Sequence, residues 1–146
     1  KGEWIRADGK AHYKGDFLNG KLHGKGEMTY QNNEIYEGNW EDGKKHGKGT
    51  YRWIKEQASY TGDWKNDQRH GYGEMVFSDG ACYKGDWEEN LYHGKGVFSW
   101  SDGRKYEGDF FKRKQQGRGK MIYSNGDCYE GEWNNDEYSG EGSYYV

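Results

Sequence analysis

The sequence predicts an all-β fold, an extended and twisted single-layer antiparallel sheet built of tandem hairpins. Short segments alternate between apolar and polar residues, and turn residues separate them, as in antiparallel β structure. A third observation is a repeat: one tyrosine recurs at steps of 23 or 24 residues. Self-similarity at a short fixed period indicates a repeat array. The recurring residues are Tyr13, Tyr36, Tyr60, Tyr83, Tyr106 and Tyr129.

The composition is unusual for a globular domain. Only 31% of the 146 residues are hydrophobic, yet 18% are aromatic, and the chain has 25 glycines and no proline. Low hydrophobicity with high charge is typical of disorder, but disordered chains are poor in aromatic residues, so regularly placed Trp and Tyr favour an ordered fold. The net charge of -3 gives no electrostatic case for nucleic acid as a partner.

We expect a single array that spans residues 1–146. A partial repeat occupies residues 1–12, and six repeats start at positions 13, 36, 60, 83, 106 and 129. Gly2-Glu3-Trp4 resembles the second half of a repeat whose first half is missing, and the chain begins with Lys1. The sequence is therefore expected to be a fragment, and more repeats or end-to-end association are expected at its edges.

Each repeat contains two predicted strands. In the first, Tyr83, Gly85 and Trp87 share one face, while Lys84 and Asp86 share the other. In the second strand, large apolar residues stand two and four positions after a Gly-x-Gly. They are Met28 and Tyr30, Tyr51 and Trp53, Met75 and Phe77, Phe98 and Trp100, and Met121 and Tyr123.

Turn length decides the strand register. A two-residue loop at Asp102-Gly103 would place the aromatic residues on opposite faces. A three-residue loop with Gly in the left-handed conformation gathers them on one face, so we predict this loop. It sets Tyr106 opposite Phe98 and Gly108 opposite Gly96. The same three-residue loop pairs Tyr83 with Met75, Tyr129 with Met121, and Tyr36 with Met28. At residues 54–57 a four-residue loop is predicted instead, and it pairs Tyr60 with Tyr51 and Gly62 with Gly49.

The paired glycines are interpreted as a packing device. Gly opposite Gly leaves a gap in the side-chain layer, across which large rings can lie and which a Cβ would block. The alternative, a phosphate cradle, needs a strand-to-helix context that the sequence lacks.

The motif Tyr-x-Gly-x-Trp, followed by His-Gly-x-Gly at this period, resembles the MORN (membrane occupation and recognition nexus) repeat. The resemblance covers essentially the whole chain and implies a single-layer sheet with one hairpin per repeat. It also implies functions as diverse as cytoskeletal and ciliary scaffolds, junctional membrane proteins, and non-catalytic appendages of lipid kinases and a lysine methyltransferase. Departures from the motif are Phe17 and Phe110 in place of Trp, and Gln116 and Ser139 in place of His.

Two residue types invite metal or redox hypotheses. The histidines of neighbouring repeats lie two strands apart, roughly 10 Å, so they cannot share a zinc ion, and we predict no metal and no cofactor. Cys82 and Cys128 are separated by four strand spacings, roughly 19 Å, too far for a disulfide. Two free thiols favour a reducing compartment, so we expect a cytoplasmic location, with association to cytoskeleton or membrane left open.

Charges gather on the face away from the aromatic residues. The register sets Lys48 opposite Asp63 and Lys95 opposite Asp109, which favours structural pairing, although a functional acidic stripe is the alternative. Arg118 stands opposite Glu132 in the same way. The only basic cluster is a candidate phosphate or lipid contact. It comprises Lys112, Arg113, Lys114 and Arg118.

No nucleophile–base set is apparent, so the chain is not expected to be an enzyme. The leading hypothesis is an interaction scaffold, cytoskeletal or ciliary, whose aromatic trough binds a protein segment or a second copy. Alternatives are a membrane or phosphoinositide-binding module and an accessory region of a larger enzyme. A self-packing core is the alternative interpretation of the trough. The candidate partner-binding residues are Tyr60, Trp64, Phe77, Tyr83, Trp87, Phe98, Trp100 and Tyr106.

Overall fold

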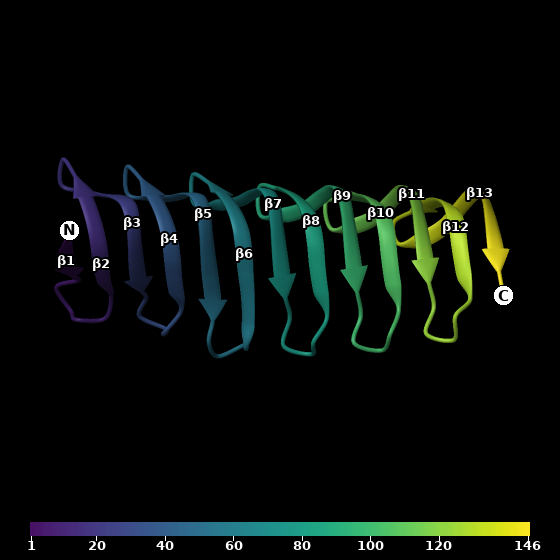
Figure 1. Ribbon diagram of the computed structural model, residues 1–146, viewed down its shortest axis with the longest axis horizontal. Helices are drawn as coiled ribbons and strands as arrows, with labels where there is room; N and C mark the ends of the chain where they lie inside the picture. The colour runs from purple at the N-terminus through teal and green to yellow at the C-terminus, as the bar shows by residue number, and fades with distance from the viewer.

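The computed structural model is one open antiparallel sheet of thirteen strands in sequence order (Figure 1). It describes the backbone of residues 1–146 and the side chains of residues 1–137 and 142–146. The all-β prediction is confirmed. The strands are β1 Gly2–Ile5, β2 His12–Leu18, β3 Lys21–Thr29, β4 Ile35–Glu41, β5 Lys44–Trp53, β6 Ala58–Lys65, β7 Gln68–Val76, β8 Cys82–Glu88, β9 Leu91–Ser99, β10 Lys105–Phe111, β11 Lys114–Ile122, β12 Cys128–Asn134 and β13 Glu137–Tyr145.

The predicted strand register is confirmed. Tyr106 pairs with Phe98 and Gly108 with Gly96, and the other predicted pairs are also present. The Ser101–Gly103 loop has three residues, closed by a bond from the Gly103 N–H to the Trp100 carbonyl, with Gly103 at a φ of 97°. Turn chemistry and the apolar pattern therefore set the same register.

The turns inside each repeat form a second class, at the upper edge of the sheet in Figure 1. Both central residues have positive φ, which is the geometry of a type I′ turn. Gly, Asn and Asp adopt this conformation most readily. Four of the six turns use only these residue types, while the other two carry Glu89 and the pair Lys112-Arg113. The six pairs are Asn19-Gly20, Asp42-Gly43, Asn66-Asp67, Glu89-Asn90, Lys112-Arg113 and Asn135-Asp136.

The motif tyrosines form the centre of the core. Five of them are fully buried: Tyr13, Tyr36, Tyr60, Tyr83 and Tyr106.

Each of these rings lies across the glycine of the opposite strand. Tyr83 donates its hydroxyl to the carbonyl of Asp86 at 2.8 Å. A Cβ on Gly96 would overlap the hydroxyl oxygen and the nearest ring carbons of Tyr83. The prediction that rings lie over paired glycines is therefore confirmed.

The motif tryptophans join neighbouring repeats. The Trp87 indole N–H donates to the carbonyl of Gly73, in the preceding repeat, at 3.1 Å. Its ring stands edge-on to Tyr83 of its own repeat at 5.3 Å and to Tyr60 of the preceding one at 5.1 Å. Edge-to-face aromatic pairs contribute about 0.5–1.5 kcal/mol each beyond the burial of their area. The Tyr and Trp rings thus form one continuous ladder along the sheet.

A β-bulge, which the sequence pattern did not predict, bends each hairpin. Gly85 pairs with Gly96, but Trp87 pairs with Tyr92, so β9 has two more residues than β8 between these pairs. The same shift occurs in the other hairpins. Bulges increase local bending and re-aim side chains. Here the bulge brings Tyr92 onto the aromatic face, against Tyr83 at 4.5 Å.

We expect Trp87→Phe to lower the free energy of unfolding by about 1 kcal/mol, because the ring contacts persist while the Gly73 carbonyl loses its N–H donor. The reverse change is the matched control: Phe110 has ring contacts with Tyr83 and Tyr106 at 5.2 and 5.0 Å but has no N–H. Phe110→Trp should not destabilise the sheet. Chemical denaturation measures both, and a neutral Trp87→Phe would contradict a structural role for the indole bond.

Candidate functional site

The structure divides the predicted partner-binding residues into two layers. Tyr60, Tyr83 and Tyr106 are fully buried, and Trp64 and Trp87 are 5% and 3% exposed, so these five belong to the core. Phe77, Phe98 and Trp100 are half-buried and pack against that core. We use the name aromatic trough for the half-buried outer row that these three share with other second-strand rings. Its members are Tyr30, Tyr51, Trp53, Phe77, Phe98, Trp100 and Tyr123.

Ring contacts make the middle of the trough continuous. Phe98 lies 5.8 Å from Phe77 and 4.7 Å from Trp100, between ring centroids. The Arg104 guanidinium lies 4.7 Å from the Trp100 ring and donates from Nε to Asp102 at 2.8 Å. Trp100 thus lies beside a turn, and the guanidinium over its ring is paired with the Asp102 carboxylate.

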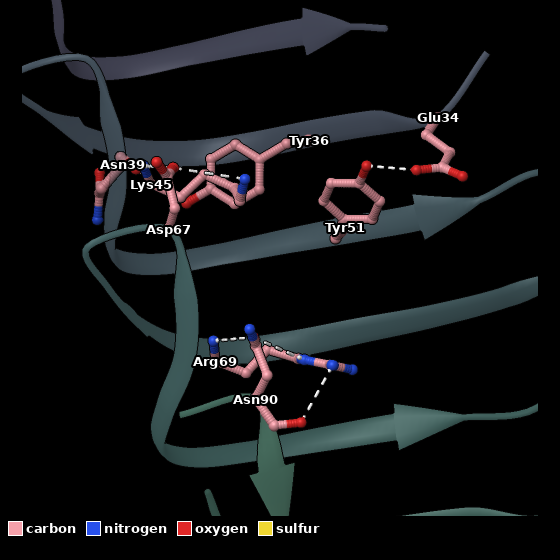
Figure 2. Close-up of polar contacts among 8 residues, drawn as sticks. All are labelled: Glu34, Tyr36, Asn39, Lys45, Tyr51, Asp67, Arg69 and Asn90. Atoms are coloured by element: carbon pink, nitrogen blue, oxygen red, sulfur yellow. Dashed lines mark hydrogen bonds and ion pairs between the residues drawn. The ribbon is translucent and has the colours of Figure 1, made fainter. Parts of the chain in front are cut away.

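Two cations lie within the aromatic face, and the sequence analysis did not find them. Lys45 Nζ lies 5.4–5.8 Å from the ring centroids of four aromatic residues. It also pairs with the Asp67 carboxylate at 3.5 Å (Figure 2). Burial lowers the pKa of Lys45, and Asp67 opposes this shift. The four rings are Tyr30, Tyr36, Tyr51 and Trp64.

Arg69 occupies the equivalent position one repeat later. Its guanidinium lies 4.9 Å from the Trp87 ring centroid and 5.6 Å from that of Trp53. Nη2 donates to the Asn90 carbonyl at 3.1 Å, and the Arg69 backbone N–H donates to Asn90 Oδ1 at 2.9 Å (Figure 2). The Arg69 guanidinium is therefore half-buried among rings, with the Asn90 carbonyl and the ring faces in place of part of its hydration.

These contacts follow a rule. The residue directly before the motif histidine, which we name the slot residue, contacts the within-repeat turn of the next repeat. The second turn residue always donates its N–H to the slot residue's carbonyl. Slot and turn residues are Leu22 with Gly43, Lys45 with Asp67, Arg69 with Asn90, Tyr92 with Arg113, and Gln115 with Asp136.

The trough has a hollow where the slot residue is short. Gln115 is buried and lines this hollow, whereas the Arg69 guanidinium lies over the rings of Trp53 and Trp87 two repeats earlier. The hollow measures about 350 Å³, and Trp100, Arg113 and Asp136 line it together with Phe98 and other rings. A side chain of a partner could enter the trough here.

The structure separates the predicted basic cluster. Lys112 and Arg113 form the turn between β10 and β11, with φ of 48° and 69°, and Lys114 is the first residue of β11. Arg113 lines the hollow in the aromatic trough. Arg118 pairs in register with Glu132, and its backbone N–H donates to Asp109, so it belongs to the charged face.

The acidic row on the charged face has a structural role. One carboxylate oxygen of Asp109 accepts the Arg118 N–H at 3.0 Å, and the other pairs with Lys95. Asp63 likewise accepts the Tyr72 N–H and pairs with Lys48. Asp16 and Asp86 accept the equivalent N–H groups. These carboxylates therefore bridge the bulge of their own hairpin, and two of them also pair with the preceding strand.

Histidines and cysteines do not assemble into a site in the described residues. His46 and His93 pair with Glu41 and Glu88 at 3.2 and 3.5 Å. No three metal-ligating side chains gather within the described part of the chain. Cys82 is on β8 and Cys128 on β12, both as free thiols.

The Ser139 side chain, which replaces a motif His, lies outside the described side chains. Among the described residues, no helix has the length and apolar character needed to cross a membrane.

The chain belongs to the MORN-repeat family. The family model matches residues 13–35, 36–55, 60–82, 83–103, 106–128 and 129–145. The resemblance drawn from the motif is therefore confirmed, and the match supports a non-catalytic repeat module for protein interaction. No curated protein matches the chain.

Two solved structures resemble the chain. One is the TCP domain of SAS-4 (dCPAP) in complex with a proline-rich motif of Ana2 (dSTIL), from Drosophila melanogaster. It is 14% identical, with a TM-score of 0.44, and the match covers 99% of this chain and 77% of that one. The other is the TCP10c domain of Drosophila melanogaster Sas-4, 15% identical with a TM-score of 0.40, covering 99% and 84%.

We expect Asp109→Asn to remove a pH-dependent part of the stability. Burial raises the pKa of Asp109, but the bonds from Lys95 and from the Arg118 N–H outweigh burial and lower it below 3.8. Because the pKa of Asp109 is lower in the folded than in the unfolded protein, its ionised carboxylate stabilises the fold at pH values above the unfolded pKa. This stabilisation is lost as pH falls through the folded pKa. The thermal midpoints of wild type and variant should therefore differ near neutral pH and converge below about pH 4. A gap that is constant with pH would contradict this role.

Proposed function

We propose that this protein is a non-enzymatic interaction scaffold whose aromatic trough binds a segment of a partner protein or a second copy of the chain. The observation that carries the proposal is the half-buried outer row of rings. Phe98 contacts both Phe77 and Trp100, and the single-layer sheet places no second layer above these described rings. Continuous apolar surfaces of this kind are typical of interaction sites.

The family supports this class of function. MORN arrays serve as scaffolds, including cytoskeletal and ciliary ones, and as appendages of enzymes. We therefore propose a cytoplasmic role at the cytoskeleton, with the cilium as one setting. Binding hot spots are enriched in Trp residues that the partner desolvates fully, which makes the half-exposed Trp100 the central residue of the proposed contact.

A second candidate function is contact with anionic lipid headgroups. Lys112 and Arg113 adopt positive φ at the β10–β11 turn, a conformation that is costly for long side chains. Backbone strain of this kind is often retained at functional positions. Because Arg113 also lines the trough and Arg118 lies on the charged face, the lipid contact would rest on Lys112 and Lys114.

Trp100→Ala tests the trough. We expect it to weaken binding of a captured partner by about 2 kcal/mol, roughly 30-fold, while the fold persists because Trp100 lies outside the buried ladder. The partner is obtained by affinity capture and its affinity is then measured by titration. The control exchanges Lys95 and Asp109, which lie on the opposite face, and should leave binding intact.

Two outcomes would contradict the trough. In the first, Trp100→Ala folds and keeps full affinity, while the Lys95/Asp109 exchange abolishes binding. This result would place the partner on the charged face. The other is full affinity in both variants with loss of binding when Lys112, Arg113 and Lys114 are neutralised. That result would favour the lipid contact instead.

A further inference from the structure

The slot residue of the fifth repeat is neutral where two earlier repeats carry a cation. Lys45 and Arg69 are slot residues, and each places its charged head over aromatic rings. Gln115 is the slot residue beside the hollow of the aromatic trough, and its side chain is uncharged and shorter than either. Two repeats therefore supply a cation to this position from their own sequence, and the fifth repeat does not.

The acceptor for such a cation is kept in the fifth repeat. Asp67 Oδ1 accepts the Lys45 backbone N–H at 2.8 Å and pairs with Lys45 Nζ at 3.5 Å. Asp136 Oδ1 likewise accepts the Gln115 backbone N–H, at 2.7 Å. Among the described residues, no cationic side chain forms an ion pair with Asp136. The Asp136 carboxylate thus holds the position of Asp67 without an ammonium group beside it.

The apolar surroundings of the site are also kept. Trp100 and Met121 line the hollow of about 350 Å³. A second hollow, of about 440 Å³, adjoins it at Met121 and Asp136 and is lined by Trp133. Trp100, Met121 and Trp133 stand in the fifth slot where Tyr30, Tyr51 and Trp64 surround the ammonium of Lys45 in the second. Rings and a carboxylate around an open space are the features that recognise a desolvated cation.

The Gln115 side chain adds a polar group without a partner. It is only 4% exposed, and it lines the hollow. Within the part of the chain that the structure describes, no hydrogen bond involves its side-chain amide. Buried polar side chains usually have such a bond. The amide oxygen of Gln115 can accept one from an ammonium group that enters the hollow.

The charges around the two hollows favour a cation. Arg104 is paired with Asp102 at 2.8 Å, so this pair adds no net charge. Arg113 and Asp136 line the first hollow, and Glu137 lines the second. The carboxylates of Asp136 and Glu137 outnumber the Arg113 guanidinium, so the remaining charge is negative and complements a positively charged group.

We propose that these two adjoining hollows bind a lysine side chain of the partner protein, with its ammonium group at the Asp136 carboxylate. The turn residue is Asp, as beside Lys45, and not Asn, as beside Arg69, so lysine is the closer match. The aliphatic stem of a lysine packs on apolar surface while its charged head keeps polar contacts. This inference rests on the proposed function, because the first hollow lies in the aromatic trough, and it specifies the side chain that the partner inserts.

The probe is the peptide acetyl-Gly-Gly-Lys-Gly-Gly-amide, titrated into the wild-type protein and followed by the NMR signal of the Trp100 indole N–H. Two control peptides replace the lysine by its neutral isostere 6-hydroxynorleucine or by glutamate. We expect the lysine peptide to shift the signal saturably, with a dissociation constant in the millimolar range. It should bind at least about tenfold more tightly than either control.

Two variants copy residues that the chain itself uses at these positions. Gln115→Lys should place the chain's own ammonium beside Asp136 and abolish binding of the lysine peptide. Asp136→Asn should weaken binding about fivefold, because the carboxylate is lost. The amide oxygen of the new residue still accepts the N–H of Gln115, as Asn90 accepts that of Arg69, so the turn is retained. Thermal unfolding confirms that each variant is folded.

Three results would overturn the inference. The first is no saturable shift on addition of the lysine peptide. The second is equal affinity for the 6-hydroxynorleucine peptide, or tighter binding of the glutamate peptide, which would assign the hollow to an anion at Arg113. The third is full affinity for the lysine peptide in folded Gln115→Lys and in Asp136→Asn.

This inference and the proposed function fail separately. If Trp100→Ala weakens binding of the captured partner while the lysine peptide does not bind, only the lysine inference fails. If the lysine peptide binds as expected but Trp100→Ala keeps full affinity for the captured partner, the trough proposal fails instead.

Discussion

The contact between a tyrosine ring and a pair of glycines is the constraint on which this sheet depends. A single layer has no second sheet to bury its rings, so burial must occur within the layer. Tyr83 achieves this by lying across Gly96, with its hydroxyl on the Asp86 carbonyl. Rings from the neighbouring positions Trp87, Tyr92 and Phe110 stand around it at 4.5–5.3 Å. Repeating this unit every hairpin builds a core that is only one residue deep.

Two further contacts convert separate hairpins into one array. The indole N–H of each motif Trp reaches the preceding repeat, and each within-repeat turn binds the slot residue of the preceding repeat. In a linear array, stability depends on such contacts between nearest neighbours. The slot residue also changes the surface: Lys45 and Arg69 fill the trough with cations, while Gln115 leaves a hollow. Variation at one position thus changes the surface of the aromatic face without altering the fold.

The sequence predicted the strands, their order and their register because the repeat period, the alternation and the loop lengths all agreed. It also predicted that rings would cover glycines and that Asp63 and Asp109 would pair with lysines. It did not predict the β-bulge, because no single residue type marks it. For the same reason it missed Lys45 and Arg69 among the rings: in a regular strand their positions carry no sign of burial.

The candidate site was only partly accessible to sequence reasoning. Alternation shows which residues share the aromatic face, but it cannot distinguish a ring in the buried ladder, such as Trp87, from one in the outer row, such as Trp100. The bulge and the neighbouring rings make that distinction.

Comparing Gly96→Ala with Gly80→Ala tests the central claim most directly. The Cβ at position 96 would overlap the Tyr83 side chain, which neighbouring rings hold in place. We therefore expect Gly96→Ala to lower the free energy of unfolding by about 3 kcal/mol or more. Gly80 has a φ of 91° with open space around it, so alanine there should cost only about 1–2 kcal/mol of backbone strain. A loss at position 96 no larger than the loss at position 80 would show that the Tyr83 ring makes room for a Cβ, and would contradict the account.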